Sequence, residues 1–534
     1  MMDWRVVPRT YLSLAVLFAI EASVFYWQLA EQITPYYPRG FDQLTYFIET
    51  FRILNRYFTE GWVAFAHYIM EGGLATGATF SLQGALAALI GGSNRTAMVS
   101  LNLLYFIALQ EMLFRTVLVR TERLSIAWTA VAMLMSLSSL FSVNGGIYDY
   151  RIDFSAMCLY GIWICAILRT DAFLNTRWSV IAGFIGGLMI SMRYFTISYL
   201  GMVTLTLFAI YVGLAVRGRP IAARQAKNAF ICGAVTLVMA APFLFAARHL
   251  LYDYYGVGHF LGAEKNIRAA EAGVAGALDH LLYYPENILW FQLGRIFLFM
   301  AAVLFLAACI KGPRRPTTAF RFKFDIAALG LAILFPLAFL SLDVAKSPVV
   351  GGIVTIPITL LCVVAATAIQ SRWILQRVIA VTALTIGAVA FVSHATAEKH
   401  LLSLQDRLTV NRLSAVAAHY VLEAGLVYPH LAFDRVNEFL NTSLISLSIL
   451  EQADIRRPIA IYPIQDLGNI FAVPREQASH GQRCRRLNNC AKREWFGDGW
   501  ARTAKVSVTG SNRASPFEPQ SVTHTTSASS TNTA

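Results

Sequence analysis

Residues 124–142 read LSIAWTAVAMLMSLSSLFS and residues 154–168 read FSAMCLYGIWICAIL, and between them lies the polar stretch VNGGIYDYRID, residues 143–153. An apolar run of about 20 residues is long enough to cross a bilayer as a helix. The first run reaches that length, and the second is somewhat shorter. The pair is typical of a membrane hairpin whose connection carries charged and aromatic side chains.

Apolar runs of this kind recur along the whole chain, at the spacing expected of consecutive membrane spans. They predict an all-α polytopic membrane protein with about eleven spanning helices. The predicted limits are 10–30, 96–118, 124–142, 154–168, 178–192, 195–216, 229–247, 289–310, 325–341, 350–370 and 376–393.

The composition supports this fold class. Of the 534 residues, 56% are hydrophobic and 14% are charged, whereas a soluble domain carries about 25% charged residues. An ordinary soluble globule is thereby excluded, and the high apolar content excludes a disordered chain. The net charge of +13 indicates basic loops at a membrane surface and not nucleic-acid binding.

Basic residues predict the orientation of the spans, because cytoplasmic loops carry an excess of Lys and Arg. One set of alternate connections is basic throughout: Arg5 and Arg9; Arg115, Arg120 and Arg123; Arg169 and Arg177; Arg217, Arg219, Arg224 and Lys227; Lys311, Arg314, Arg315, Arg321 and Lys323; Arg372 and Arg377. The other short connections hold mostly single cations. We therefore predict a cytoplasmic N-terminus and an extracytoplasmic C-terminus, in a membrane that is the bacterial inner (cell) membrane.

The predicted extracytoplasmic side carries the long segments. The connection from Glu31 to Arg95 includes 41–56 and 61–71, whose mixed apolar and charged residues suit helices lying in the interface plane. Three regions are predicted: a transmembrane catalytic module over 1–393, an extracytoplasmic C-terminal domain over 394–505, and a disordered Ser/Thr-rich tail over 506–534.

Two cysteines stand apart from the apolar segments, in the motif Cys484-Arg-Arg-Leu-Asn-Asn-Cys490. In an oxidising extracytoplasmic compartment this pair is expected to form a local disulfide, the alternative being two unrelated thiols. Zinc sites need four ligands, and no second pair of this kind follows. No cofactor is predicted, and a divalent metal is left as an unfavoured possibility.

The clearest candidate site lies in the connection quoted at the start. Within six consecutive positions, 148–153, the predicted extracytoplasmic mouth of the bundle carries five polar or aromatic residues: Tyr148, Asp149, Tyr150, Arg151 and Asp153. Ionisable groups at membrane depth are usually functional or paired. The alternative is a structural ion pair that caps the following helix, because acids stabilise helix N-termini.

Two further features lie on the same predicted side. Asp42 begins the long first connection and either belongs to the site or simply caps the helix after it. Lys346 opens the hairpin Lys346-Ser347-Pro348, ahead of Pro357. It is either an interfacial anchor or a point charge for a phosphate.

Together these features resemble the GT-C class of integral-membrane glycosyltransferases, in particular the protein O-mannosyltransferase and lipid A aminoarabinose transferase branch. The class has an acidic motif in the first outer loop, matched here by Asp42-Gln43-Leu44-Thr45-Tyr46, with Gln43 in place of the usual second acid. It has a second acidic site matched by Tyr148 to Asp153, and a basic-Pro hairpin matched by Lys346 to Pro357. The resemblance covers roughly 1–393.

The resemblance implies a sugar donor carried on a polyprenyl phosphate or pyrophosphate, and an acceptor that is a lipid, a polysaccharide or a protein. Asp42 would be the general base for the acceptor hydroxyl, and Asp149 and Asp153 would orient the acceptor or a cation. The remaining residues would bind substrate: Arg151, Arg193 and Lys346 at the leaving phosphate, and Tyr46, Tyr148 and Tyr150 at the sugar.

A second polar and aromatic set follows at Tyr252–Gly256 with His249, His259 and Lys265. We interpret it in the first place as an interfacial aromatic belt, the alternative being that it shapes the entrance for the acceptor. Two alternatives to the enzyme stay open. A transporter or flippase of lipid-linked glycans would need a polar path, for which only Glu21, Glu111 and Arg295 lie in mid-span. A non-catalytic scaffold predicts that the acids and Lys346 do not converge.

Overall fold

The computed structural model describes residues 6–38, 41–261, 270, 272–274, 276–309, 319–343, 345–367, 373–397, 399, 402–423, 430–433, 442–453, 462–463, 506–509 and 524–526. The chain divides into two compact units. Unit 1 comprises Met1–Pro35 and Trp62–His400, and unit 2 comprises Tyr36–Gly61 and Leu401–Ala534. Each unit is considered by itself.

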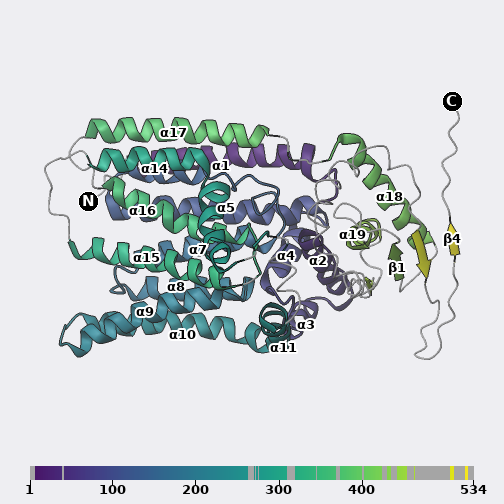
Figure 1. The fold of residues 1–534 in the computed structure, drawn as a ribbon, viewed down its shortest axis with the longest axis horizontal. Helices are drawn as coiled ribbons and strands as arrows, with labels where there is room; N and C mark the ends of the chain where they lie inside the picture. Colours follow the sequence, from purple (N-terminus) through teal and green to yellow (C-terminus); the bar gives the residue numbers. More distant parts are fainter. Residues whose placement is uncertain are drawn as a thin grey trace. The chain divides into compact units, whose positions relative to one another are not determined.

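Unit 1 is a helical bundle whose long helices run side by side (Figure 1). Its elements are α1 (Val6–Gln28), η1 (Leu29–Ile33), α3 (Val63–Met70), α4 (Thr79–Gly91), α5 (Arg95–Thr121), α6 (Leu124–Met135), α7 (Ile152–Arg169), α8 (Thr176–Met192), α9 (Thr196–Val216), α10 (Ala222–Ala246), α11 (Arg248–Leu251), η2 (Tyr252–Leu261), α13 (Ala277–Asn287), η3 (Ile288–Leu293), α14 (Gly294–Cys309), α15 (Ala319–Leu342), η4 (Val350–Val354), α16 (Thr355–Thr367) and α17 (Trp373–Thr396).

The predicted fold class is confirmed for this bundle, since every element of unit 1 named above is helical. Each of the eleven predicted apolar segments overlaps a helix. Eight helices in the described part of the chain are long and apolar enough to cross a membrane, so the chain is an integral membrane protein. Three of the predicted spans fall on the shorter apolar helices α6, α8 and α16 with η4, and the count of eleven stays a prediction.

Helix α6 ends earlier than the span predicted for it. Residues 124–142 were expected to be one span, but α6 ends at Met135. The next backbone groups bond elsewhere: Ser138 N donates to Leu293 O at 3.3 Å and Ser139 N to Gln292 O at 3.4 Å. The apolar run therefore turns out of the helix and folds against η3.

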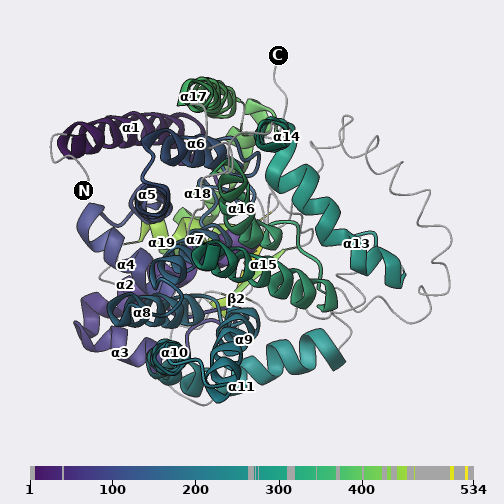
Figure 2. The same cartoon turned by 90° about the vertical axis from the view of Figure 1, so that its left-hand side faces the viewer.

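Helix α7 forms the centre of the bundle. It packs against α5, α8, α15 and α16, and an end-on view places it among them (Figure 2). Its side chains are almost all buried, including the bulky Tyr160 and Trp163. Burial on every side explains why this helix can be apolar all round. Its two ends then mark the two ends of the bundle.

Unit 2 contains α2 (Phe41–Glu60), α18 (Leu404–Glu423), α19 (Thr442–Gln452) and four short strands, β1 (His430–Phe433), β2 (Tyr462–Pro463), β3 (Val506–Thr509) and β4 (His524–Thr526). The strand order is β2-β1-β3-β4, with β1–β2 parallel and the other pairs antiparallel. Strands β3 and β4 lie within the segment 506–534 that was expected to be disordered. Helix α2 and helix α3 of unit 1 begin within two residues of the helices expected at 41–56 and 61–71.

Candidate active site at one end of the bundle

The loop between α6 and α7 is held by an amide from the neighbouring helix α5. Asn102 Nδ2 donates to Ile147 O at 3.1 Å and to Asp149 O at 2.7 Å. Asn102 Oδ1 accepts from Ser155 Oγ at 2.9 Å. Because Asn102 is fully buried, these bonds fix the backbone on which Asp149 stands.

Asp149 is buried and only one of its carboxylate oxygens is used. Oδ2 accepts hydrogen bonds from Gly145 N and from Arg151 Nε, each at 2.6 Å. Arg151 also donates to Asn144 Oδ1. Oδ1 is buried and has no hydrogen-bond partner in the described part of the chain. An orphaned buried carboxylate oxygen is costly unless a proton, water or ligand satisfies it.

Gly145 is required where this loop meets the hairpin before α16. Its φ of +81° lies in the left-handed region, and a Cβ there would stand 2.6 Å from the Val349 side chain. A glycine permits both the backbone conformation and the close approach. The loop therefore packs directly on the hairpin that carries Lys346.

Burial controls the protonation of Asp149. Removal from water raises the pKa of this carboxyl above its ordinary value, although Arg151 and the Gly145 amide act in the opposite direction. Asp153 nearby adds to the increase. A raised pKa favours the protonated form of the carboxyl, and a carboxyl shifted in this way is suited to general acid–base chemistry.

Asp153 and Arg193 form the second acid–guanidinium pair. Asp153 lies in the first turn of α7, and Arg193 follows the last residue of α8. Arg193 Nη1 contacts Asp153 Oδ1. Burial alone would lower the pKa of Arg193, but Asp153 and the nearby Tyr199 and Tyr255 raise it overall, so the guanidinium is permanently charged.

The segment η2 extends this cluster. The Tyr255 ring stacks on Phe195 with a centroid distance of 5.8 Å and lies 5.2 Å from the His259 ring. His259 Nδ1 is 3.3 Å from Asp343 Oδ1. That contact is an approach without hydrogen-bond alignment, since both imidazole nitrogens are buried without a hydrogen-bond partner among the described residues.

Lys346 lies beside the same cluster but already has partners. Its Nζ donates to Leu340 O and Ser341 O, both at 2.9 Å, at the C-terminus of α15. It also stands 5.1 Å from the centroid of the Tyr284 ring. Burial lowers the pKa of Lys346 to about 8, with Asp343 acting against that decrease. The residue is a helix cap that retains one free proton for a ligand.

Tyr148 and Tyr150 are packed into the interior. Tyr148 stacks on Phe25 at 5.5 Å, with Lys399 Nζ 5.6 Å from its centroid. Tyr150 packs on Phe80 at 4.9 Å. Both rings are almost completely buried, so their predicted role at the sugar stays a prediction.

Asp42 and Tyr46 belong to unit 2. Asp42 lies in the first turn of α2 and its side chain is exposed, while Tyr46 is buried. The convergence of Asp42 with Asp149, expected from the sequence, thus stays a prediction. The expected disulfide between Cys484 and Cys490 lies outside the described residues.

The structure therefore brings together Asp149, Arg151, Asp153, Arg193 and Lys346 at one end of unit 1. Sequence reasoning missed three partners in this cluster, namely Asn102, Asp343 and Tyr284. It interpreted Tyr255 and His259 as an interfacial belt. The sequence did contain a signal for these residues. Consecutive spans cross the membrane in opposite directions, so the C-terminal ends of α8, α10 and α15 are expected on the same side.

Within the described residues, no group of three or more His, Cys, Asp or Glu side chains is placed to hold a metal ion. The donors that the cluster does present are guanidinium, ammonium, phenol and imidazole groups, which suit an anionic or hydroxylated ligand.

Comparisons with known proteins find few relatives. No family model and no curated protein matches the chain. Two solved structures are similar in fold: the crystal structures of ArnT from Cupriavidus metallidurans in the apo state and bound to undecaprenyl phosphate. Each is 14% identical and covers 82% of this chain; the alignments cover 77% and 76% of ArnT, with TM-scores of 0.48 and 0.46.

Proposed function

We propose that the chain is a membrane glycosyltransferase of the GT-C type, which moves a sugar from a polyprenyl-phosphate donor to an envelope acceptor at the end of the bundle that carries Asp149. One observation carries the proposal. Two acid–guanidinium pairs and Lys346 gather at one end of the bundle, beside a buried carboxylate oxygen that has no hydrogen-bond partner in the described part of the chain.

The chemistry of sugar transfer needs these groups. The acceptor oxygen forms a bond to the sugar C1, and the bond between C1 and the phosphate oxygen breaks. The acceptor proton passes to a carboxylate, and the electron pair leaves with the polyprenyl phosphate. Fixed positive charge stabilises that leaving group in the transition state, and a positioned carboxylate takes the proton.

In the structure each guanidinium is neutralised by a carboxylate, so a phosphate has to compete for it. Asp149 would hold Arg151 in place through its Oδ2, and Arg151 would offer its remaining donors to the phosphate. Arg193 would retain Asp153 and offer its remaining donors.

Asp42 is proposed as the general base on the strength of the sequence resemblance. Its position in the first turn of an amphipathic helix, with an exposed side chain, leaves it accessible to an acceptor.

The proposal also assigns the membrane face on which the reaction occurs. The candidate site is placed on the extracytoplasmic face of the bacterial inner membrane, where a polyprenyl-linked donor is met by lipid, polysaccharide or protein acceptors. The orientation follows from the basic residues of the alternate connections, which are predicted to be cytoplasmic.

The test is envelope glycolipid analysis by mass spectrometry in a host lacking the endogenous gene. Asp149→Asn and Asp42→Asn are compared with Asp253→Asn, an equally conservative change at an exposed aspartate of η2. We expect loss of one glycoform in the first two variants and none in the control, at equal protein levels. Unchanged glycans in both site variants would favour the scaffold, and unmodified donor trapped in one leaflet would favour the flippase.

A further inference from the structure

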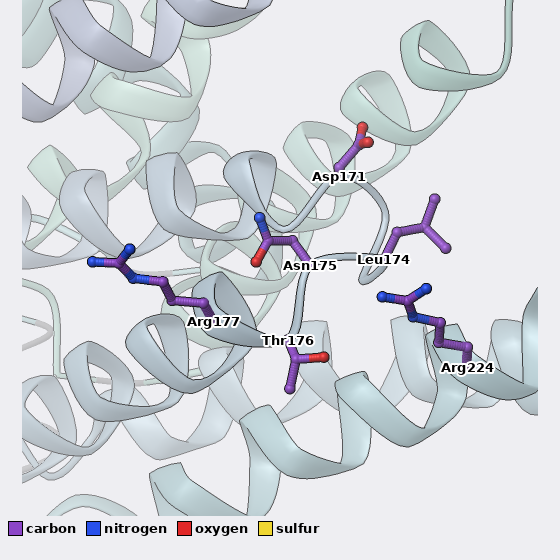
Figure 3. A pocket seen from close by; sticks show the side chains of 6 residues that line it. All are labelled: Asp171, Leu174, Asn175, Thr176, Arg177 and Arg224. Atoms are coloured by element: carbon purple, nitrogen blue, oxygen red, sulfur yellow. The ribbon is translucent and has the colours of Figure 1, made fainter.

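A cavity of about 430 Å³ lies at the opposite end of unit 1, where α7 passes into α8 (Figure 3). Its lining residues are Asp171, Leu174, Asn175, Thr176, Arg177 and Arg224. Helix α7 has 18 residues, so at about 1.5 Å per residue this cavity is about 27 Å from the candidate active site. Nothing in the proposed reaction uses it.

The wall of the cavity is a turn held in one conformation by α10. Asp171, Ala172 and Phe173 have φ values of 55°, 57° and 61°, in the left-handed region. Gln225 Nε2 donates to Ala172 O at 2.8 Å, and Asn228 Nδ2 donates to Phe173 O at 2.7 Å. Since both amides are buried, the turn is a rigid wall and not a mobile loop.

The charge of the cavity is positive. Arg120 binds the only acid in the lining, with Nη1 3.1 Å from Asp171 Oδ1. Arg177 and Arg224 have exposed side chains and form no hydrogen bond or ion pair with the residues that the structure describes. The two guanidinium groups flank the turn in Figure 3. Two cations thus remain uncompensated at one cavity.

Neutral donors accompany the two cations. Asn175 Oδ1 accepts from Trp178 N at 3.2 Å as the cap of α8, which leaves the amide NH₂ of Asn175 for a ligand. Thr176 Oγ1 lies 3.1 Å from Asn228 Oδ1, and its oxygen can still accept a further hydrogen bond. Guanidinium and amide donors around a cavity are the usual ligands of a phosphate group.

We propose that this cavity binds a phosphate group, presented either by the headgroup of an anionic lipid or by a soluble phosphate ester. In the predicted orientation this end faces the cytoplasm, whose leaflet carries anionic lipids. The proposal stands apart from the sugar-transfer reaction, because it uses residues at the other end of the bundle.

The first experiment measures binding to purified full-length protein. One arm counts phosphatidylglycerol retained from mixed phosphatidylglycerol–phosphatidylcholine nanodiscs by native mass spectrometry. The other arm titrates inorganic phosphate against chloride at equal ionic strength and follows the melting temperature. The combined change Arg177→Gln and Arg224→Gln is expected to weaken binding about tenfold in whichever arm responds, since it removes both charge-assisted contacts.

Two further variants separate a pocket from general basic attraction. Arg217→Gln with Arg219→Gln removes two exposed arginines from the same end of the bundle but outside the cavity, and binding should be unchanged. Leu174→Trp fills the cavity without changing charge, and it should weaken binding as much as the double arginine variant. The melting temperature without ligand checks that each variant is folded.

The outcomes are distinct. A response in the lipid arm alone identifies a headgroup, and a response in the phosphate arm alone identifies a soluble ester; either supports the pocket. The proposal is overturned if neither arm responds, if the Arg217 and Arg219 control loses binding equally, or if Leu174→Trp binds like wild type.

Discussion

The two ends of the bundle treat buried charge in different ways. At the end opposite the candidate active site, Arg120 contacts Asp171 and Asp325 and donates to Leu168 O at 2.6 Å, tying α5, α7 and α15 together. At the candidate site, three buried atoms have no hydrogen-bond partner among the described residues: Asp149 Oδ1 and both imidazole nitrogens of His259. The carboxylates at the opposite end are paired with Arg120 and hold helices together, although Arg120 Nε is itself buried without a partner among the described residues. At the candidate site a carboxylate oxygen is left for a ligand.

The largest expected effect comes from Arg193. We expect Arg193→Gln to reduce sugar transfer by about 100-fold or more, because a developing phosphate charge loses a preorganised donor and Asp153 is left without its cation. Arg193→Lys keeps the charge but loses the planar fork, so an intermediate rate is expected. Transfer by wild-type and variant protein in proteoliposomes checks this, and a full rate in Arg193→Gln would remove Arg193 from the site.

The matching change at the other end is Arg120→Gln. It leaves Asp171 and Asp325 partly buried without their cation, and we expect a loss of about 2–3 kcal/mol in the free energy of unfolding, somewhat less than for a fully buried pair. The transfer rate per folded molecule should stay the same. Thermal unfolding and transfer assays on one preparation separate the two quantities, and a rate loss without destabilisation would contradict the comparison.

A smaller effect is expected at Asn102, which acts by positioning. Asn102→Ala removes the donors to Ile147 O and Asp149 O and should cost about 1–3 kcal/mol of stability. Because the loop then moves, the pH profile of transfer that reports Asp149 should shift. Asn102→Asp keeps the shape of the side chain without the donors, and an unshifted profile in both variants would assign Asn102 a purely structural role.

The smallest effect is the pH dependence due to Lys346. Its pKa is lowered by burial from 10.5 to about 8, so between pH 8 and pH 10.5 the unfolded chain binds more protons at this group than the folded chain. Stability from this group therefore rises with pH across that window. Lys346→Met should remove the part of the rise in melting temperature that is due to Lys346. A smaller rise should persist, because the pKa of Lys399 is also lowered to about 8. An identical pH dependence of the melting temperature in wild type and Lys346→Met would refute the assignment to Lys346.

Much of the bundle follows from local sequence. Apolar runs are long enough to locate every predicted span on a helix, because in a bilayer each span must satisfy its own backbone. The end of α6 could not be predicted in this way. Its serines bond to carbonyls of η3, about 150 positions away, and no local pattern encodes that partner.

The candidate site likewise has a part that local sequence predicts and a part that it does not. Asp149, Arg151 and Asp153 are neighbours in sequence and were identified together. Pairing of Asp153 with Arg193 depends on how α7 and α8 pack, and the capping of α15 by Lys346 depends on a hairpin geometry. Both require tertiary contacts, so the sequence predicted the residues but not their partners.

The most direct test of the account is donor turnover by purified protein in liposomes made with envelope lipids of the host, followed as release of free polyprenyl phosphate by mass spectrometry. The account predicts release by wild type and by Asp253→Asn, and none by Asp149→Asn. Release by Asp149→Asn at the wild-type rate would contradict it.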